Sequence, residues 1–156
     1  MHDNAKLIET FYTAFGNRDA ETMAGCYHDD ATFTDPAFVG LDANGVRNMW
    51  RMLVERGKDL EIQFSGVEAD DQRGKAHWVA TYTFSATGRK VKNEIDATFE
   101  FKDGKISKHT DSFDFWKWTR MALGPSGTFL GWSGFMKNKV RSQAMSGLRK
   151  FIDKRG

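Results

Sequence analysis

The chain has 156 residues, a mass of 17.7 kDa and a formal net charge of +2, which indicates one globular domain. Apolar residues make up 40% and charged residues 28% of the sequence, a balance that excludes a disordered, collagen-like or coiled-coil protein. No stretch of about 18 apolar residues is present, so no membrane span is expected. No signal-peptide pattern is visible, and the single cysteine, Cys26, excludes an internal disulfide, so we expect a cytoplasmic protein.

Two features of the composition are unusual. Phe, Trp and Tyr together account for 13% of the residues, which predicts either a ring-rich core or a cavity lined with rings. The charge is also uneven, because residues 137–156 hold seven Lys or Arg against one Asp, whereas the preceding residues are mildly acidic. The C-terminal segment is therefore expected to be a basic extension of an acidic body.

In chain order, the first half predicts helices and one short strand. Apolar residues follow helical spacing over 3–16, 19–27 and 42–57, and each segment begins at or next to an aspartate that can cap a helix. Residues 31–35 alternate as in a strand, which Pro36 ends. The first half is therefore predicted to be mainly helical.

The second half changes to the period of strands. Alternating segments lie over 60–64, 78–84, 91–101 and 107–115, separated by Gly- and Asp-containing turn sequences. A short helix over 116–123 and a basic helix with Val140, Ala144, Leu148 and Ile152 on one face are expected to follow. Helices followed by an antiparallel meander form an α+β layout, in which one curled sheet encloses an apolar space.

Two segments resemble a known superfamily. The run 27–36, Tyr-His-Asp-Asp-Ala-Thr-Phe-Thr-Asp-Pro, and the run 104–114, which contains His-Thr-Asp-Ser-Phe-Asp, are similar to segments of nuclear transport factor 2-like proteins. Members include ketosteroid isomerase, limonene epoxide hydrolase and the SnoaL-type polyketide cyclases. The resemblance covers about residues 5–123. It implies a cone-shaped α+β barrel over 1–123. The charge and apolar spacing of residues 124–156 predict a basic amphipathic extension of the same domain.

The resemblance also implies site residues. Asp35 matches the general base of the isomerase, and Asp111 matches the catalytic aspartate on the last strand of the hydrolase and the cyclase. The isomerase's oxyanion-hole tyrosine falls at Phe11, one place from Tyr12. This superfamily hosts both catalysts and binding proteins, so the resemblance is weakly specific for any one activity.

The second oxyanion donor of the isomerase, an aspartic acid, falls on the strand over 91–101. Ala97 takes its place if the hairpin phenylalanines are aligned, and Asp96 if the glycine turns are aligned without a gap. We favour Ala97 as the inward residue because it shares the parity of Ile95 and Phe99, and a one-residue slip would turn every side chain to the opposite face. The position of Asp96 stays open at this point.

The candidate site residues have chemistry of their own. Asp35 shares the parity of Phe33, and in an apolar interior its pKa would rise toward neutrality, which suits a general base. His109, Asp111 and Phe113 share one face of the last strand, where the carboxylate can set the tautomer and charge of the imidazole. The alternative interpretations are a turn aspartate before proline for Asp35 and a water-facing polar cluster for the pair.

Eight aromatic residues are candidate walls of a substrate cavity, with an ordinary core as the alternative interpretation. No histidine pair has metal-ligand spacing and no phosphate-binding loop is present, so neither a metal nor a cofactor is expected. The candidate substrate-binding residues are Tyr12, Phe15, Phe33, Trp50, Trp78, Tyr82, Phe99 and Phe113.

These observations favour a cofactor-independent enzyme of isomerase, cyclase or hydrolase type that acts on a hydrophobic organic substrate. Asp35 would be the base, Asp111 the partner acid, and His109 would tune the acid. The alternatives are a binding protein that uses the same cavity without chemistry, and a dimerisation module that uses the aromatic cluster at 115–136. We expect a homodimer and a small hydrophobic ligand, and the basic extension is expected to cover the cavity or form the dimer contact rather than bind nucleic acid or a membrane surface.

Overall fold

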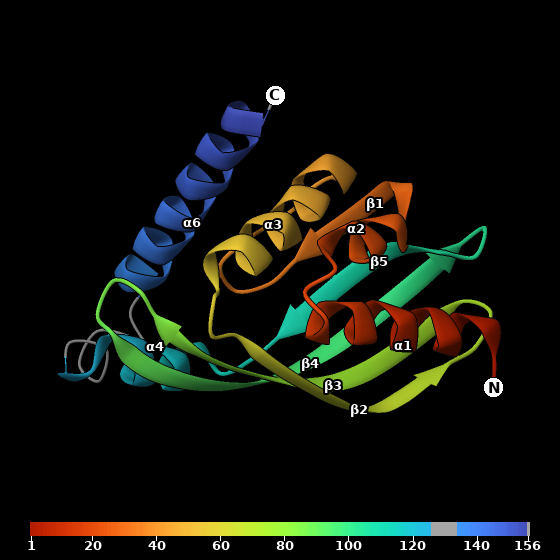
Figure 1. The fold of residues 1–156 in the computed structure, drawn as a ribbon, viewed down its shortest axis with the longest axis horizontal. Coiled ribbons are helices and arrows are strands. Elements are labelled where there is room, and N and C mark those ends of the chain that lie inside the picture. Colours follow the sequence, from red (N-terminus) through yellow and green to blue (C-terminus); the bar gives the residue numbers. More distant parts are fainter. Residues whose placement is uncertain (126–133, 156) are drawn as a thin grey trace.

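Three helices lie on one face of a curved five-stranded sheet in the computed structural model (Figure 1). The structure describes residues 1–125 and 134–155, except for the side chain of Phe135. The expected α+β cone is confirmed, as an open sheet that wraps around the helices. In chain order the elements are α1 Asp3–Gly16, α2 Ala20–Gly25, β1 Tyr27–Thr34, α3 Ala43–Arg56, β2 Glu61–Ala69, β3 Arg73–Phe84, β4 Arg89–Lys102, β5 Lys105–Ser112, α4 Phe115–Leu123 and α6 Gly134–Arg155.

The helices begin where side chains accept hydrogen bonds from free backbone N–H groups. Asp19, Asp42 and Asp114 each accept from the N–H three residues later, at the starts of α2, α3 and α4. For α1 the prediction was wrong by one residue, because His2 rather than Asp3 caps the helix, through its Nδ1. Asp3 instead lies in the first turn, where its negative charge interacts favourably with the positive end of the helix dipole.

The sheet has the strand order β1-β5-β4-β3-β2 and is mixed rather than purely antiparallel. The last four strands form the predicted antiparallel meander. Strand β1 instead runs parallel to β5, with Phe33 beside His109 in the register. No hairpin links these two strands, so alternation along the sequence did not reveal their relative direction. This pairing places the end of β1 against the middle of β5.

The burial pattern along β4 shows which of its side chains face the helices. Val91, Asn93, Ile95, Ala97 and Phe99 are buried, and the residues between them are exposed. The favoured phase is therefore confirmed: Ala97 faces inward and lies opposite Asp111 on β5. Asp96 faces outward, where it contacts His77 Nδ1 at 2.9 Å. Asp96 is thus excluded from the interior.

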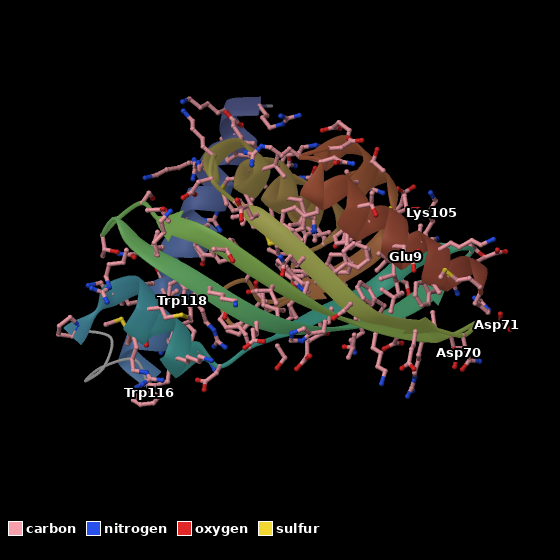
Figure 2. All side chains as sticks on the ribbon, turned by 60° about the horizontal axis from the view of Figure 1, so that its bottom comes forward. Glu9, Asp70, Asp71, Lys105, Trp116 and Trp118 are labelled. Atoms are coloured by element: carbon pink, nitrogen blue, oxygen red, sulfur yellow. The ribbon has the colours of Figure 1, made fainter. Side chains whose placement is uncertain are left out.

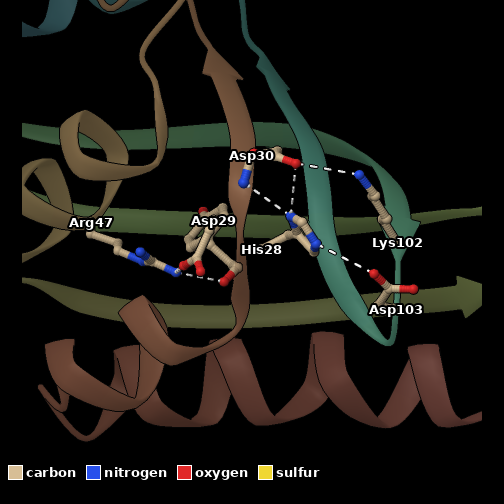
Figure 3. Close-up of polar contacts among 7 residues, drawn as sticks. His28, Asp29, Asp30, Arg47, Lys102 and Asp103 are labelled. Carbon is tan, nitrogen blue, oxygen red and sulfur yellow. Dashed lines mark hydrogen bonds and ion pairs between the residues drawn. The ribbon is translucent and has the colours of Figure 1, made fainter.

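Strand β1 begins at Tyr27 rather than at the expected Ala31, because an irregular register between Tyr27 and Thr32 hides its alternation. Polar contacts hold this irregular part in place (Figure 3). The guanidinium of Arg47 on α3 donates to the Tyr27 carbonyl at 2.8 Å and to Asp29 at 3.1 Å. On the other side, His28 contacts Asp103 in the β4–β5 turn at 3.5 Å. Helix α3 on one side and the β4–β5 turn on the other therefore hold the start of β1 in place.

The C-terminal elements lie at one end of the sheet. Figure 2 shows Trp116 and Trp118 of α4 at the end opposite to Asp70 and Asp71 of the β2–β3 hairpin. Helix α4 packs on β4, and α6 packs on α3 of the same chain. The expected contacts of the apolar residues between 126 and 133 lie outside the described residues. Among the residues that are described, no helix combines the length and apolarity that crossing a membrane requires.

Candidate active site

The fold brings the three candidate catalytic residues together from its first and last strands. Asp35 directly follows β1, whereas His109 and Asp111 project from β5 toward the helices. His109 is fully buried, and Asp111 is 4% exposed. Thr34 of β1 is paired with Thr110 of β5, so Asp35 and Asp111 directly follow two paired residues. Burial and, to a smaller extent, the negative charge of Asp111 raise the pKa of Asp35. The shared face of His109 and Asp111 is confirmed.

A chain of side-chain hydrogen bonds crosses the interior. Trp50 Nε1 donates to the Tyr27 hydroxyl at 2.8 Å, and that hydroxyl is 2.8 Å from His109 Nδ1. His109 Nε2 in turn lies 2.8 Å from Asp111 Oδ1, which Trp78 Nε1 also approaches at 3.4 Å. Buried polar groups are costly unless they are paired, and in this chain each of the named atoms has a partner.

The donors at its two ends give the chain a direction. Trp50 can only donate, so the Tyr27 oxygen accepts and its own proton is available for His109 Nδ1. His109 then carries its proton on Nε2 and donates it to Asp111. With this neutral tautomer every proton in the chain has an acceptor. The arrangement therefore holds the imidazole as a donor to the carboxyl group.

Asp35 is held by a tight turn. Its Oδ1 accepts from the backbone N–H groups of Ala37 and Phe38, at 2.7 and 2.6 Å. The pKa of this carboxyl is raised to about 7, mainly by burial and in part by the charge of Asp111, while the two N–H groups act in the opposite direction. Part of the Asp35 residue remains exposed at the surface. A carboxyl with this pKa exchanges its proton near neutrality, as a general base requires.

The two carboxyl groups share one feature. Each is anchored through Oδ1, Asp35 by two backbone N–H groups and Asp111 by His109 and Trp78. Within the described part of the chain, the Oδ2 atom of neither group has a hydrogen-bond partner. Each carboxyl is thus fixed in position and still has an oxygen for a further contact.

Six of the eight predicted cavity residues fill the interior by packing against one another. Tyr12, for example, stacks on Phe64 at 5.5 Å, and Trp50 meets Phe15 edge-on at 5.1 Å. Tyr82 and Phe113 are the exceptions, because they are only partly buried. Contact with substrate stays a prediction for all eight. The six packed residues are Tyr12, Phe15, Phe33, Trp50, Trp78 and Phe99.

The hydroxyl of Tyr12 differs from the polar atoms of this hydrogen-bonded chain. It is buried, and among the described residues it has no hydrogen-bond partner. Burial raises the pKa of this phenol well above its ordinary value, and the charge of Asp111 raises it further. A neutral phenol near Asp111 therefore holds a proton that no described group accepts.

This difference between two tyrosines predicts opposite effects of the same substitution. Tyr12→Phe is expected to raise the free energy of unfolding by about 1 kcal/mol, because it removes an unpaired buried hydroxyl. Tyr27→Phe is expected to lower it by roughly 2–4 kcal/mol, because it leaves Trp50 Nε1 and His109 Nδ1 unpaired. Urea unfolding of both variants measures the two changes. A clear loss of stability in Tyr12→Phe would contradict the absence of a partner.

Three polar residues that contact the site or face the interior were not identified from the sequence. Tyr27 was placed on a helix, although a buried tyrosine generally needs a hydrogen-bond partner and this signal could have marked it. Asn93 is an inward polar residue on β4, 6% exposed, and its parity with Ile95 was a usable signal. Arg141 on α6 donates to the Pro36 carbonyl at 2.9 Å, and no local pattern predicts this contact.

Among residues 1–125 and 134–155, no group of three or more His, Cys, Asp or Glu side chains is arranged to hold a metal ion. Cys26 is buried, and burial raises the pKa of its thiol to about 11. The chemistry that the described residues offer is therefore that of carboxyl, imidazole and phenol groups.

A match to the sequence model of a known domain identifies the family of this chain. The model of the SnoaL-like domain matches residues 8–109, a span that begins within α1 and ends within β5 at His109. The chain belongs to the SnoaL-like family. Asp111 and the C-terminal helices of this SnoaL-like protein lie beyond the matched span. No curated protein sequence matches the chain.

Solved structures share the fold of this SnoaL-like protein. An epoxide hydrolase of the limonene epoxide hydrolase type from M. tuberculosis is 18% identical, with a TM-score of 0.62 over 81% of this chain and 92% of the other. IdmH, a putative polyketide cyclase from Streptomyces antibioticus, is 21% identical, with a TM-score of 0.65 over 79% and 99%. An NTF2-like protein of unknown function from Burkholderia pseudomallei is 18% identical, with a TM-score of 0.66 over 78% and 98%. At these identities the likeness shows the fold alone.

Proposed function

We propose that this protein is a cofactor-independent enzyme that moves a proton on a hydrophobic organic substrate, in an isomerisation, cyclisation or hydrolysis. Asp35 is the base, Asp111 is the partner acid, and His109 tunes Asp111. Proteins of similar structure include an epoxide hydrolase and a putative polyketide cyclase, and we infer the class of reaction from this likeness. The assignment to this chain depends on its own side chains.

The observation that carries the proposal is the state of the two carboxyl groups. Each is held through Oδ1, and neither Oδ2 atom has a partner among the described residues. A structural carboxylate in a protein interior normally has its oxygens paired, because an unpaired charge is costly to bury. Two anchored carboxyl groups with available oxygens are instead the arrangement that general acid–base catalysis needs.

The proton balance follows from their proximity. Like charges in one interior disfavour ionisation of both groups, so the pair shares a proton, and the reactive form is the one in which Asp111 holds that proton and Asp35 is ionised. Asp35 Oδ2 takes a proton from an activated carbon or from water. Asp111 Oδ2 gives a proton to the substrate oxygen that gains negative charge, while Asp111 Oδ1 keeps accepting from His109. Exchange with solvent then restores the starting state.

The substrate is expected to meet these groups where the aromatic packing opens. Tyr82 and Phe113 are partly buried, whereas the rings behind them are fully packed. The Tyr82 hydroxyl accepts from Trp118 Nε1 of α4 at 2.8 Å, so its own proton can be donated to a substrate oxygen. This combination supports an aromatic or alicyclic substrate that carries a carbonyl, hydroxyl or epoxide oxygen.

The test uses three kinds of substrate: hydrophobic epoxides, aromatic polyketide esters with an acidic carbon next to a carbonyl, and cyclic β,γ-unsaturated ketones. Product formation is followed by mass spectrometry, together with deuterium uptake at the acidic carbon in D₂O. Asp35→Asn and Asp111→Asn are expected to lower kcat/KM by about 10² or more and to remain folded. Asp96→Asn, on the outer face of β4, is the control and is expected to keep the wild-type rate.

The pH profile then separates the two roles. With Asp35 as the base, kcat/KM should rise with pH through the pKa of about 7, because the ionised form is the active one. A rate that falls through the same range would exchange the roles of the two aspartates. Full turnover in both Asn variants would falsify the mechanism, and tight ligand binding without turnover in the wild type would support a binding protein instead.

A further inference from the structure

Helix α6 contacts the turn that holds Asp35. Arg141, in the first half of the helix, donates from Nε to the carbonyl oxygen of Pro36 at 2.9 Å. Pro36 directly follows Asp35 in the sequence, and the next two N–H groups, of Ala37 and Phe38, bind the Asp35 carboxyl. The Arg141 bond therefore attaches α6 to the same short turn whose backbone fixes the candidate base.

The helix that supplies Arg141 lies outside the residues that the family model matches. The SnoaL-like model ends at residue 109, and α6 spans Gly134–Arg155. Helix α6 is held against α3 through buried Leu148 and Phe151, so its position is set by apolar packing. Arg141 therefore projects toward the turn from a helix that is packed against the rest of the chain.

The charges around Asp35 come from three elements. Asp111 on β5 raises the pKa of the Asp35 carboxyl, and Arg141 on α6 lowers it. On β3, the phenol of Tyr82 has a pKa that is raised by burial and by the charge of Asp35. Among the groups that shift the pKa of Asp35, Arg141 is the cation, so its attraction for the ionised carboxylate opposes the repulsion from Asp111.

We propose that Arg141 is a positioning residue for Asp35: its guanidinium fixes the Pro36 carbonyl and places a positive charge beside the candidate base. The guanidinium uses Nε for the carbonyl, and its charge does not form a direct ion pair with Asp35, which would occupy Oδ2. The ionised carboxylate is therefore favoured while its second oxygen stays available. This inference rests on the proposed role of Asp35, and it makes the C-terminal extension part of the site.

The test measures Asp35 directly and needs no substrate. The protein is labelled with ¹³C at the aspartate carboxyl carbons, and the Asp35 signal is assigned by its loss in Asp35→Asn. Its titration midpoint is followed by NMR in the full-length wild type, in Arg141→Gln and in Arg141→Lys. Lys150→Gln is the control, because Lys150 is an exposed cation on the same helix. The control removes the same charge from α6 away from the turn.

Arg141→Gln is expected to raise the midpoint of Asp35, because a nearby positive charge is lost, whereas Lys150→Gln should leave it at the wild-type value. Arg141→Lys keeps the charge and is expected to give a midpoint between those of wild type and Arg141→Gln. An unchanged midpoint in folded Arg141→Gln overturns the inference, as does an equal shift in Lys150→Gln. If Arg141→Gln does not fold, Arg141→Met replaces it as the neutral variant, and an unchanged midpoint in that variant overturns the inference. A raised midpoint in a protein without turnover would retain the inference and reject the proposed function.

Discussion

Asp35→Asn is expected to stabilise the protein above pH 7 and, under the proposed function, to lower kcat/KM by about 10² or more. Burial raises the pKa of the Asp35 carboxyl from 3.8 to about 7 in the folded chain, so the folded state binds the proton more tightly than the unfolded state. Below the lower value both states are protonated and the group has no effect. As pH rises from the unfolded pKa of 3.8 to the folded pKa of about 7, wild-type stability falls by up to about 4 kcal/mol, and above the folded pKa the loss is complete. Partial exposure of Asp35 reduces this loss toward about 2 kcal/mol.

Asparagine retains an oxygen that can accept from Ala37 and Phe38 and has no charge to bury. The free energy of unfolding, measured by urea at pH 5 and pH 8, should therefore change less with pH in Asp35→Asn than in the wild type. Asp153→Asn, an exposed position on α6, is the control and is expected to follow the wild-type values. Parallel pH curves for Asp35→Asn and wild type would show that the carboxyl is not desolvated.

His109→Leu is expected to cost about 3–5 kcal/mol of stability, whereas His77→Leu should cost less than about 1 kcal/mol. The two histidines make similar contacts, since His109 Nε2 is 2.8 Å from Asp111 and His77 Nδ1 is 2.9 Å from Asp96. They differ in burial: His109 is 0% exposed, whereas His77 lies on the outer face of the sheet. Removing one partner of a buried pair leaves an uncompensated polar group, but a surface pair contributes little.

Urea unfolding at pH 7 measures both losses. The double variant His109→Leu with Asp111→Leu completes a mutant cycle and is expected to recover part of the stability, because the carboxyl left without its donor is removed as well. Similar small losses for His109→Leu and His77→Leu would mean that water reaches the interior pair. Such a result would also remove the reason for treating His109 as the group that tunes Asp111.

Period-two alternation predicted the parts of the site that lie along one strand. It placed His109 and Asp111 on one face of β5, and on β4 it placed Ala97 inward and Asp96 outward, because each choice depends only on neighbours in the sequence. The helix-capping roles of Asp19, Asp42 and Asp114 were likewise predictable from local chemistry.

Contacts between distant segments were not predictable in this way. The parallel pairing of β1 with β5, the Tyr27–His109 bond and the Arg141–Pro36 bond each join segments more than 70 residues apart. The abundance of rings also predicted a lined cavity and a filled core equally well. The structure packs Trp50, Trp78 and Phe99 into the core, because ring-to-ring contact is available once the helices cover the sheet.

The parallel pairing of β1 with β5 has a consequence for how the protein forms. Strand β1 ends at Thr34 and its partner residues begin at Ile106, so β1 cannot complete its pairing until most of the chain has been synthesised. Contacts of such sequence separation close a large loop and are formed slowly. Asp35 lies at the end of β1, and His109 and Asp111 lie on β5. Partly folded chains that keep the β2–β4 hairpins would therefore have native sheet structure but no assembled acid–base site, so activity should return after most of the secondary structure during refolding.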